Sequence, residues 1–237
     1  MIGIGAGVSI SDAVGLLPSL GGGGGAPDYG DSLFYYPLDD NNSTTYTDLL
    51  GESATLATGH GTGTITDVET SDFNGVTHAV NIQTHGKALY HNGTYNLATT
   101  DLTVEIFHKQ TISNTFTSFG FSTDPTTSGA YAHMYTNDGI SVYTNAATVS
   151  GSANITSGLT LTNVVHFCIQ SISGTLYYSV DGNVFATATA TSTNVYPAFG
   201  VRLHSDQVSF SRWSQFVITD GGKYGTSNFT APTSPLF

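Results

Sequence analysis

The chain has 237 residues, only 9 % of them charged, and a formal net charge of −12. All five Lys and Arg residues follow position 86, whereas the first 86 residues carry ten carboxylates. Because phosphate binding needs clustered cations, this distribution excludes nucleic acid as a partner and disfavours anionic membrane surfaces. The 13 Tyr and 13 Phe residues are enough for a sizeable core, so the chain is not expected to be disordered.

Residues 1–30 differ from the rest and are interpreted as a docking arm with a linker. Apolar residues alternate with Gly or Ser over positions 1–10, a short helix is expected over 11–17, and Gly21–Gly25 is a flexible linker. The arm lacks the cationic start of a signal peptide, and an acidic residue and a proline interrupt it, so we expect no membrane span. We expect strand addition to another protein through its apolar side chains, which are Ile2, Ile4, Val8, Ile10, Leu16 and Leu17. A frayed terminus is the alternative.

From residue 33 onward the pattern is one of short strands and turns. Strands are expected at 33–38, 54–58, 64–67, 76–82, 101–109, 116–122, 130–135, 140–144, 164–170, 195–201 and 207–219. A hairpin is expected over 175–187, because Asp181-Gly182 suits a type I′ turn. With no helix expected in this part, the pattern predicts an all-β sandwich.

Two residues within these strands are given structural roles. Glu105 lies between Val104 and Ile106 in an alternating strand, and we expect it to face solvent or to pair with His108 or Lys109. The single cysteine, Cys168, permits no intrachain disulfide and is interpreted as a small buried hydrophobe.

The C-terminal stretch 210–237 resembles the closing motif of laminin-G-like, concanavalin A-like domains in bacteriophage structural proteins. The matching positions are Lys223, Tyr224, Thr226, Ser227, Asn228, Phe229, Thr230, Pro232 and Pro235. Segments 34–39 with 46–48, 87–109, and 163–184 are similar to further motifs of this family, although Leu102 stands where Phe is usual and no Trp precedes Val164. The tail aromatics Tyr224, Phe229 and Phe237 are expected to pack back on the domain.

The resemblance implies a concanavalin A-like jelly-roll β-sandwich over residues 31–237 and a non-enzymatic virion structural protein. Such a protein would be a capsid decoration, a head fibre or a tail-associated protein. It would be made in the host cytoplasm, placed on the outer surface of the virion and docked to other virion proteins through residues 1–30. We expect many copies on a symmetric particle, or a homo-oligomer.

Three other functions stay open. A carbohydrate-binding module would recognise host surface glycans. A polysaccharide depolymerase is a second alternative. The sequence lacks the E-x-D-x-x-E strand pattern that places two carboxylates on one face, and this counts against such an enzyme. An arm that enters a viral membrane is a third, and its weak hydrophobicity counts against it.

Two candidate sites follow from the loops and strands between residues 122 and 143. Asp124, Asn137 and Asp138 offer the oxygen ligands that Ca²⁺ prefers, although Asp-Pro and Asn-Asp-Gly are also common turn sequences. Sugar binding is assigned to Tyr131, His133, Tyr135 and Tyr143. The first three of these share one strand face if the period of two holds, and that face would equally suit the core. The eight histidines show no metal-ligand spacing.

Overall fold

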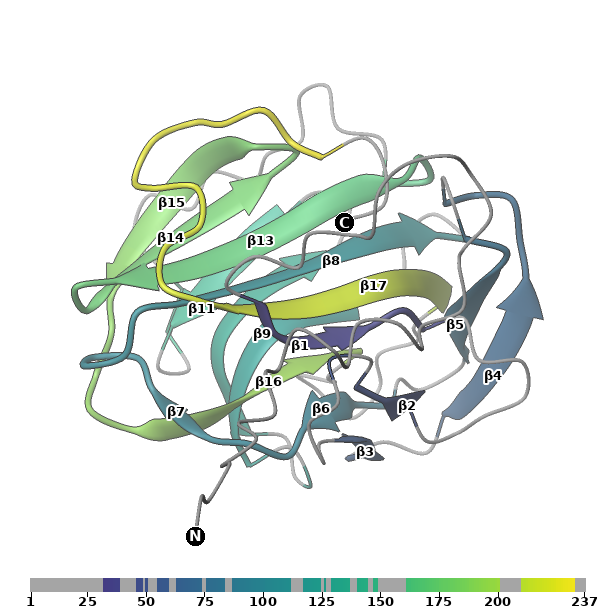
Figure 1. The fold of residues 1–237 in the computed structure, drawn as a ribbon, viewed down its shortest axis with the longest axis horizontal. Coiled ribbons are helices and arrows are strands. Elements are labelled where there is room, and N and C mark those ends of the chain that lie inside the picture. Colours follow the sequence, from purple (N-terminus) through teal and green to yellow (C-terminus); the bar gives the residue numbers. More distant parts are fainter. Residues whose placement is uncertain are drawn as a thin grey trace, which may run out of the picture. The chain divides into compact units, whose positions relative to one another are not determined.

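Two antiparallel β-sheets, here called sheet A and sheet B, make up the fold in this computed structural model (Figure 1). The structure describes residues 32–38, 46–48, 50, 55–59, 63–73, 76–83, 87–111, 117–124, 126, 129–136, 140–144, 147–148, 161–200 and 210–232. Residues 31–236 form one compact unit, and the expected docking arm, with its helix, lies outside the described residues. Within the described ranges there is no helix that is long and apolar enough to cross a membrane.

Sheet A contains eight strands and lies at the front in Figure 1. In spatial order they are β15 (Asn183–Thr189), β14 (Thr175–Val180), β13 (Val165–Ile172), β8 (Leu102–Gln110), β17 (Phe210–Asp220), β5 (His78–Gln83) and β4 (Thr64–Glu69). The eighth strand, β1 (Ser32–Tyr36), pairs with the second half of β17, while β5 pairs with its first half. The last strand that the structure describes, β17, therefore lies in the middle of the sheet.

Sheet B contains nine strands and lies behind sheet A. In spatial order they are β12 (Ala147–Thr148), β11 (Ile140–Thr144), β10 (Gly129–Thr136), β9 (Thr117–Asp124), β16 (Asn194–Phe199), β6 (Leu89–His91), β3 (Thr55–Thr58) and β2 (Tyr46–Thr47). The ninth, β7 (Tyr95–Asn96), pairs with the start of β16. The expected all-β sandwich is thereby confirmed, and four short strands that we did not predict (β2, β6, β7 and β12) complete it.

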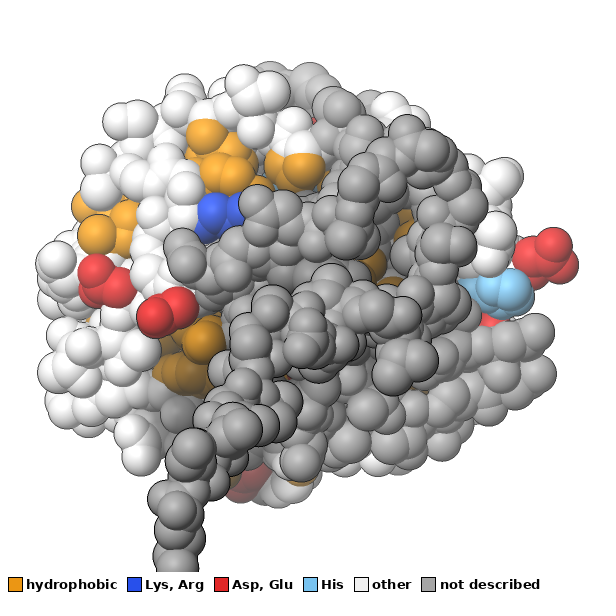
Figure 2. Space-filling view, viewed as in Figure 1, with side chains coloured by type: hydrophobic (Ala, Val, Ile, Leu, Met, Phe, Trp, Pro, Cys, Tyr) orange, Lys and Arg blue, Asp and Glu red, His pale blue; other side chains and the backbone are white. Residues whose placement is uncertain are grey.

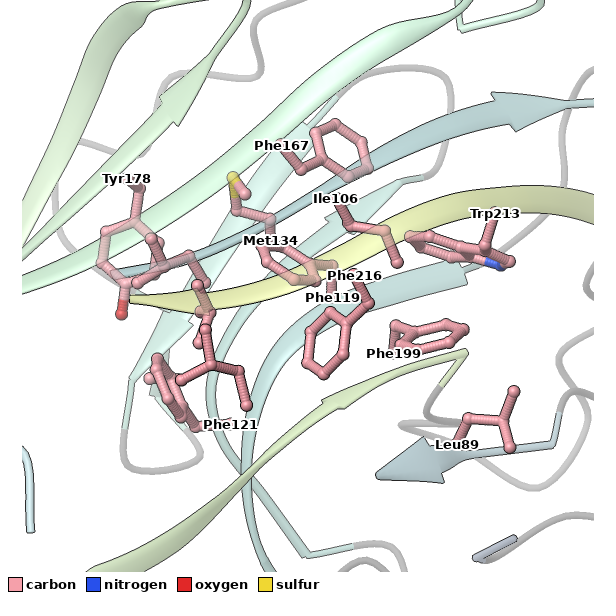
Figure 3. Packing of buried hydrophobic residues seen from close by; sticks show 14 of the residues in the cluster. Leu89, Ile106, Phe119, Phe121, Met134, Phe167, Tyr178, Phe199, Trp213 and Phe216 are labelled. Carbon is pink, nitrogen blue, oxygen red and sulfur yellow. The ribbon is translucent and has the colours of Figure 1, made fainter. Parts of the chain in front are cut away.

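The core between the sheets is built around aromatic rings from both of them (Figure 3). Phe199 of β16 lies 5.3 Å from Trp213 and 5.2 Å from Phe216 of β17, measured between ring centroids. Phe119 of β9 lies 6.1 Å from Phe167 of β13. All five rings are fully buried, so residues far apart in the sequence join the two sheets through one apolar cluster.

A β-bulge corrects our prediction for the face of Tyr131. Ala130 and Ala132 of β10 pair with Ser122 and Phe121 of β9, which follow each other directly, so Tyr131 is an extra residue in its strand. A bulge breaks the period of two, and the side chain of Tyr131 joins the core cluster together with Ala132. Ala132 and Met134 both belong to that cluster, so His133 between them points to the outer face and does not share a face with Tyr131.

The predicted hairpin around Asp181 and Gly182 is confirmed. The two residues connect β14 to β15 and have φ values of 46° and 76°, as a type I′ turn requires. The side chain of Asp181 accepts a hydrogen bond of 2.8 Å from the backbone N–H of His166, so the turn is also tied to β13.

Candidate functional site

A buried polar cluster lies on the outer face of sheet A, and Glu105 is at its centre. Its side chain is completely buried. One oxygen, Oε1, accepts a hydrogen bond of 2.6 Å from Lys223 Nζ. The other, Oε2, lies 2.7 Å from the hydroxyl of Tyr224, which donates, and 3.0 Å from His166 Nε2. Our expectation that Glu105 faces solvent or pairs with His108 or Lys109 was wrong, because its partners come from β13 and from the segment after β17.

His108 and Lys109 have other surroundings. The ring of His108 points into the core, where it stacks on Phe167 at 5.0 Å between centroids. Lys109 Nζ lies 2.6 Å from Asp72 Oδ1, and Arg212 binds the second oxygen of the same carboxylate. The strand alternation of β8 is therefore regular, but the partners of its outer side chains are distant in sequence.

The environment of Glu105 keeps its carboxyl ionised. Burial by itself raises the pKa of this carboxyl, but the hydrogen bond and charge of His166 and the charge of Lys223 outweigh burial, so that its pKa is lowered. Burial and the neighbouring carboxylate raise the pKa of Tyr224, which stays a hydrogen-bond donor. The thiol pKa of Cys168 is raised by burial and by the same carboxylate, and this buried cysteine is a small hydrophobe as expected.

The two cluster residues after β17 belong to a segment, residues 221–232, that we call the strap. In Figure 1 it turns back at the end of β17 and continues in yellow beside β13, β14 and β15. Thr103 Oγ1 accepts a hydrogen bond of 3.0 Å from the backbone N–H of Lys223, and Gln170 Oε1 accepts one of 2.8 Å from that of Tyr224. Side chains of β8 and β13 thus fasten the strap to the outer face of sheet A.

The far end of the strap is fastened to the hairpin. Phe229 donates its N–H to the carbonyl of Gly182 at 2.9 Å, and Asn228 Oδ1 accepts from the N–H of Val184 at 2.9 Å. The rings of Tyr224 and Phe229 stack with centroids 3.9 Å apart. A Cβ atom on Gly182 would lie 2.0 Å from the carbonyl oxygen of Phe229, so this position requires glycine for the close approach as well as for its φ.

This arrangement is suited to holding the strap rather than to catalysis. Both oxygens of Glu105 are engaged by donors, and its lowered pKa removes it as a general acid near neutral pH. No group of three or more potential metal ligands occurs among the residues that the structure describes. The packing of Tyr224 and Phe229 agrees with our prediction for the tail, whereas Phe237 lies outside the described residues.

A different surface, the outer face of sheet B, offers partly exposed aromatic rings. Leu89 and Phe199 point into the core, so their neighbours Tyr90 and Ala198 point outward. Tyr90 packs on Ala198, and its ring meets that of Tyr196 edge to face, with centroids 5.8 Å apart. Both tyrosines are partly exposed. We call this pair the tyrosine platform.

Small buried residues lie beside the tyrosine platform in sheet B. Ala198 pairs with Gly120 of β9, and Tyr196 pairs with Ser122. Gly120 has a φ of 152°, and a Cβ atom there would lie 2.0 Å from the carbonyl oxygen of Ala132, so only glycine fits. Ala198, Gly120 and Ser122 are buried, so among the residues that the structure describes the two partly exposed tyrosine rings are the part that offers a sugar ring a surface for stacking.

Sequence reasoning missed this platform because β6 has only three residues, too few for a visible alternation. The informative signal was the position of each tyrosine in the alternation of its strand. Tyr90 directly follows the core residue Leu89, and Tyr196 directly follows the core residue Val195. A tyrosine in the opposite phase to buried neighbours lies on the outer face.

Two of the four predicted sugar-binding residues, Tyr131 and His133, are buried. Tyr131 is 3 % exposed, and its hydroxyl accepts a hydrogen bond of 2.7 Å from the N–H of Thr191, which gives it a structural role. His133 is fully buried on β10, and burial lowers its pKa to about 4. Tyr143 of β11 pairs with His133, and Tyr135 follows two positions later on β10. Sugar binding by these residues stays a prediction.

The calcium prediction is represented in the structure by Asp124 alone. Its Oδ1 accepts hydrogen bonds from the N–H of Thr126 at 3.0 Å and from the hydroxyl of Thr126 at 2.6 Å, the pattern of a local turn. Asn137 and Asp138 lie outside the described residues. Carboxylate and amide oxygens at these three positions fit the chemistry that Ca²⁺ requires, and calcium binding stays a prediction.

No family model matches this sequence, and no curated protein matches it either. Solved structures, in contrast, match the fold. Domain 4 of AbnA, a GH43 extracellular arabinanase from Geobacillus stearothermophilus solved in complex with arabinotriose, has a TM-score of 0.52 at 14 % identity, covering 81 % of this chain and 93 % of that one.

Two further structures are similar to a comparable degree. A Bacillus subtilis protein of unknown function with a galectin-like fold has a TM-score of 0.51 at 10 % identity, covering 81 % of this chain and 96 % of that chain. The globular domain of Trypanosoma cruzi calreticulin has a TM-score of 0.51 at 9 % identity, with 81 % and 89 % covered. At these identities the likeness concerns the fold alone, and the described strands form a jelly-roll sandwich of the concanavalin A-like class.

Proposed function

We propose that this chain is a non-enzymatic, glycan-binding protein on the outer surface of a bacteriophage virion. The observation that carries the glycan-binding part is the tyrosine platform, in which the partly exposed rings of Tyr90 and Tyr196 meet on an outer sheet face. The virion part rests on the resemblance of residues 210–237 and of the earlier segments to phage structural domains. Residues 1–30 would dock the protein to other virion proteins.

The fold supports glycan binding without deciding it. One structural neighbour is a domain solved with a bound oligosaccharide, and another has a galectin-like fold. Against an enzyme stands the state of Glu105, which is enclosed by its donors and has no exposed oxygen to offer a substrate. A weak contact at each platform becomes strong when many copies on a symmetric particle engage one cell surface.

Replacing Tyr196 by alanine is expected to weaken binding to the best glycan about ten-fold, equivalent to about 1.4 kcal/mol, because the ring that stacks on the sugar is lost. The measurement is titration calorimetry of the full chain against the best ligand from a polysaccharide panel, with and without EDTA to test the calcium sites. Tyr177→Ala, which removes a partly exposed ring from sheet A, is the matched control. Equal affinity of Y196A and wild type would remove the platform from the site.

Antibodies against the full chain are expected to decorate intact particles of the bacteriophage that encodes it. Decoration at regular positions on the head or tail, seen by electron microscopy, would place the protein on the outer surface. Deleting residues 1–30 should abolish incorporation, because the arm is the proposed docking element. Intact particles that lack the protein by mass spectrometry would refute the virion assignment while leaving glycan binding untouched.

A further inference from the structure

We infer that the tyrosine platform takes a single sugar ring, displayed at the end of a glycan chain or of a branch, and does not take the flat face of an extended polysaccharide. This inference rests on the proposed glycan binding and adds the form of the sugar to it. It follows from the angle between the two rings and from the burial of the residues beside them.

The rings of Tyr90 and Tyr196 stand nearly at right angles to each other. Their planes make an angle of 82°, and their centroids lie 5.8 Å apart. In such an edge-to-face pair the edge of one ring points at the face of the other. A sugar ring stacked on one tyrosine therefore finds no parallel face on the second, and the platform offers one stacking face at a time.

This geometry separates a single sugar ring from an extended chain. A polysaccharide that lies flat on a surface presents successive sugar rings in about one plane, so it needs aromatic faces that are parallel to that plane. Because the second face of the platform is turned by 82°, it cannot stack on the next ring of the same flat chain. The end of a chain or of a branch needs contact with one sugar ring only, and one stacking face provides that contact.

The residues next to the platform do not extend the stacking surface. The outward positions of one row across sheet B, paired in order, are Tyr90, Ala198, Gly120 and His133. The last three of these residues are buried, so they offer no surface to a further sugar ring. Ser122, in the neighbouring row, is buried as well. In this part of sheet B the two tyrosine rings are therefore the contact surface.

The neighbouring sequence does not add a ring to the platform either. The stretches 84–86 and 201–209, which lie outside the described residues near β6 and β16, contain no Phe, Tyr or Trp. Tyr143 stands in the same row as Tyr90 but four strands away, about 19 Å at the usual strand spacing. That distance is too long for both tyrosines to contact one sugar ring.

The test measures the affinity of the full chain for linear gluco-, xylo-, manno- and arabino-oligosaccharides of one to six residues, by titration calorimetry, and its adsorption to crystalline cellulose. In each series that binds, we expect the affinity to change less than about three-fold from two residues to six, and we expect no adsorption to cellulose. Tyr90→Ala and Tyr196→Ala should each weaken binding about ten-fold, because one ring supplies the stacking face and the other holds it in place. Tyr177→Ala removes a ring from sheet A, whose face also exposes hydrophobic side chains in separate places (Figure 2), and it should leave the affinity unchanged.

The outcomes separate this inference from the proposed function. An affinity that rises more than about ten-fold between two and six residues would overturn the inference and leave glycan binding standing, and so would adsorption to cellulose that Y196A abolishes. A rise that Tyr143→Ala removes would show in addition that the glycan crosses sheet B. Binding to a polysaccharide of the panel but to none of its oligosaccharides would likewise overturn the inference alone. No binding to any oligosaccharide or polysaccharide would overturn both.

Discussion

Replacing Glu105 by alanine is expected to lower the free energy of unfolding by about 3–5 kcal/mol, the usual cost of breaking a buried ion pair from one side. The change leaves Lys223 and His166 facing a cavity, and it removes the acceptor for the Tyr224 hydroxyl. The strap loses its central attachment, while the backbone bonds that involve Thr103 and Gln170 remain.

Urea unfolding measures the loss of stability, and amide hydrogen exchange of residues 221–232 locates it. The double variant Glu105→Leu/Lys223→Met is the informative control, and we expect it to recover only part of the loss, because His166 and the Tyr224 hydroxyl still lack their acceptor. If E105A unfolds at the wild-type urea concentration and its strap exchanges no faster, the cluster does not hold the strap.

Acid is expected to destabilise this protein from about pH 6.5 downward, above the usual pKa of its carboxyls. Burial lowers the pKa of three histidines: His108 to about 3, and His91 and His133 to about 4. In the unfolded chain these groups have a pKa of about 6.5. Between these values the unfolded state binds more protons, so stability is fully present above about pH 6.5 and is lost as the pH falls toward 4 and 3.

The size of the stability loss follows from how far the pH falls below the unfolded-state pKa of the histidines. Between pH 7 and pH 5 each buried histidine removes about 2 kcal/mol, and the three together about 6 kcal/mol. A domain is typically stable by 5–15 kcal/mol, so this loss is a large share of the total. The carboxyls of Asp72 and Glu105, whose pKa values are lowered, add to the loss at still lower pH.

His108→Phe tests this account at one site. The variant keeps a ring between Phe167 and Trp213 but has nothing to protonate, and within the described residues neither ring nitrogen of His108 has a hydrogen-bond partner. We expect the stability difference between pH 8 and pH 5 to shrink by about 2 kcal/mol, measured by urea unfolding followed with circular dichroism. The comparison at pH 8 isolates the packing change, and an unchanged pH dependence would contradict the account.

Local patterns in the sequence were sufficient to predict most strands and the hairpin. Alternation over 101–109 predicted β8 within one residue, and Asp181-Gly182 predicted the turn, because both signals depend only on neighbouring residues. The bulge at Tyr131 was not predictable in this way, since the extra residue is defined only by the pairing of β10 with β9.

The polar cluster was beyond local reasoning for a related cause. The partners of Glu105 are 61 and 118 residues away in the sequence, and the pattern around Glu105 indicates only that it alternates with core residues. The family resemblance covers both segments, the strand of Glu105 and the tail with Lys223 and Tyr224. It does not indicate that the two segments are in contact. The platform was missed because Tyr90 and Tyr196 form a site only after β6 and β16 pair.

The position of β17 determines when sheet A can be completed during synthesis. This strand joins β8 on one side to β5 and β1 on the other, yet it is made after all of them. Until Phe210–Asp220 has left the ribosome, those strands have no common neighbour, and their apolar faces stay exposed to water. Contacts of such long sequence separation form slowly, so sheet A of the nascent chain is most prone to aggregate just before β17 is available.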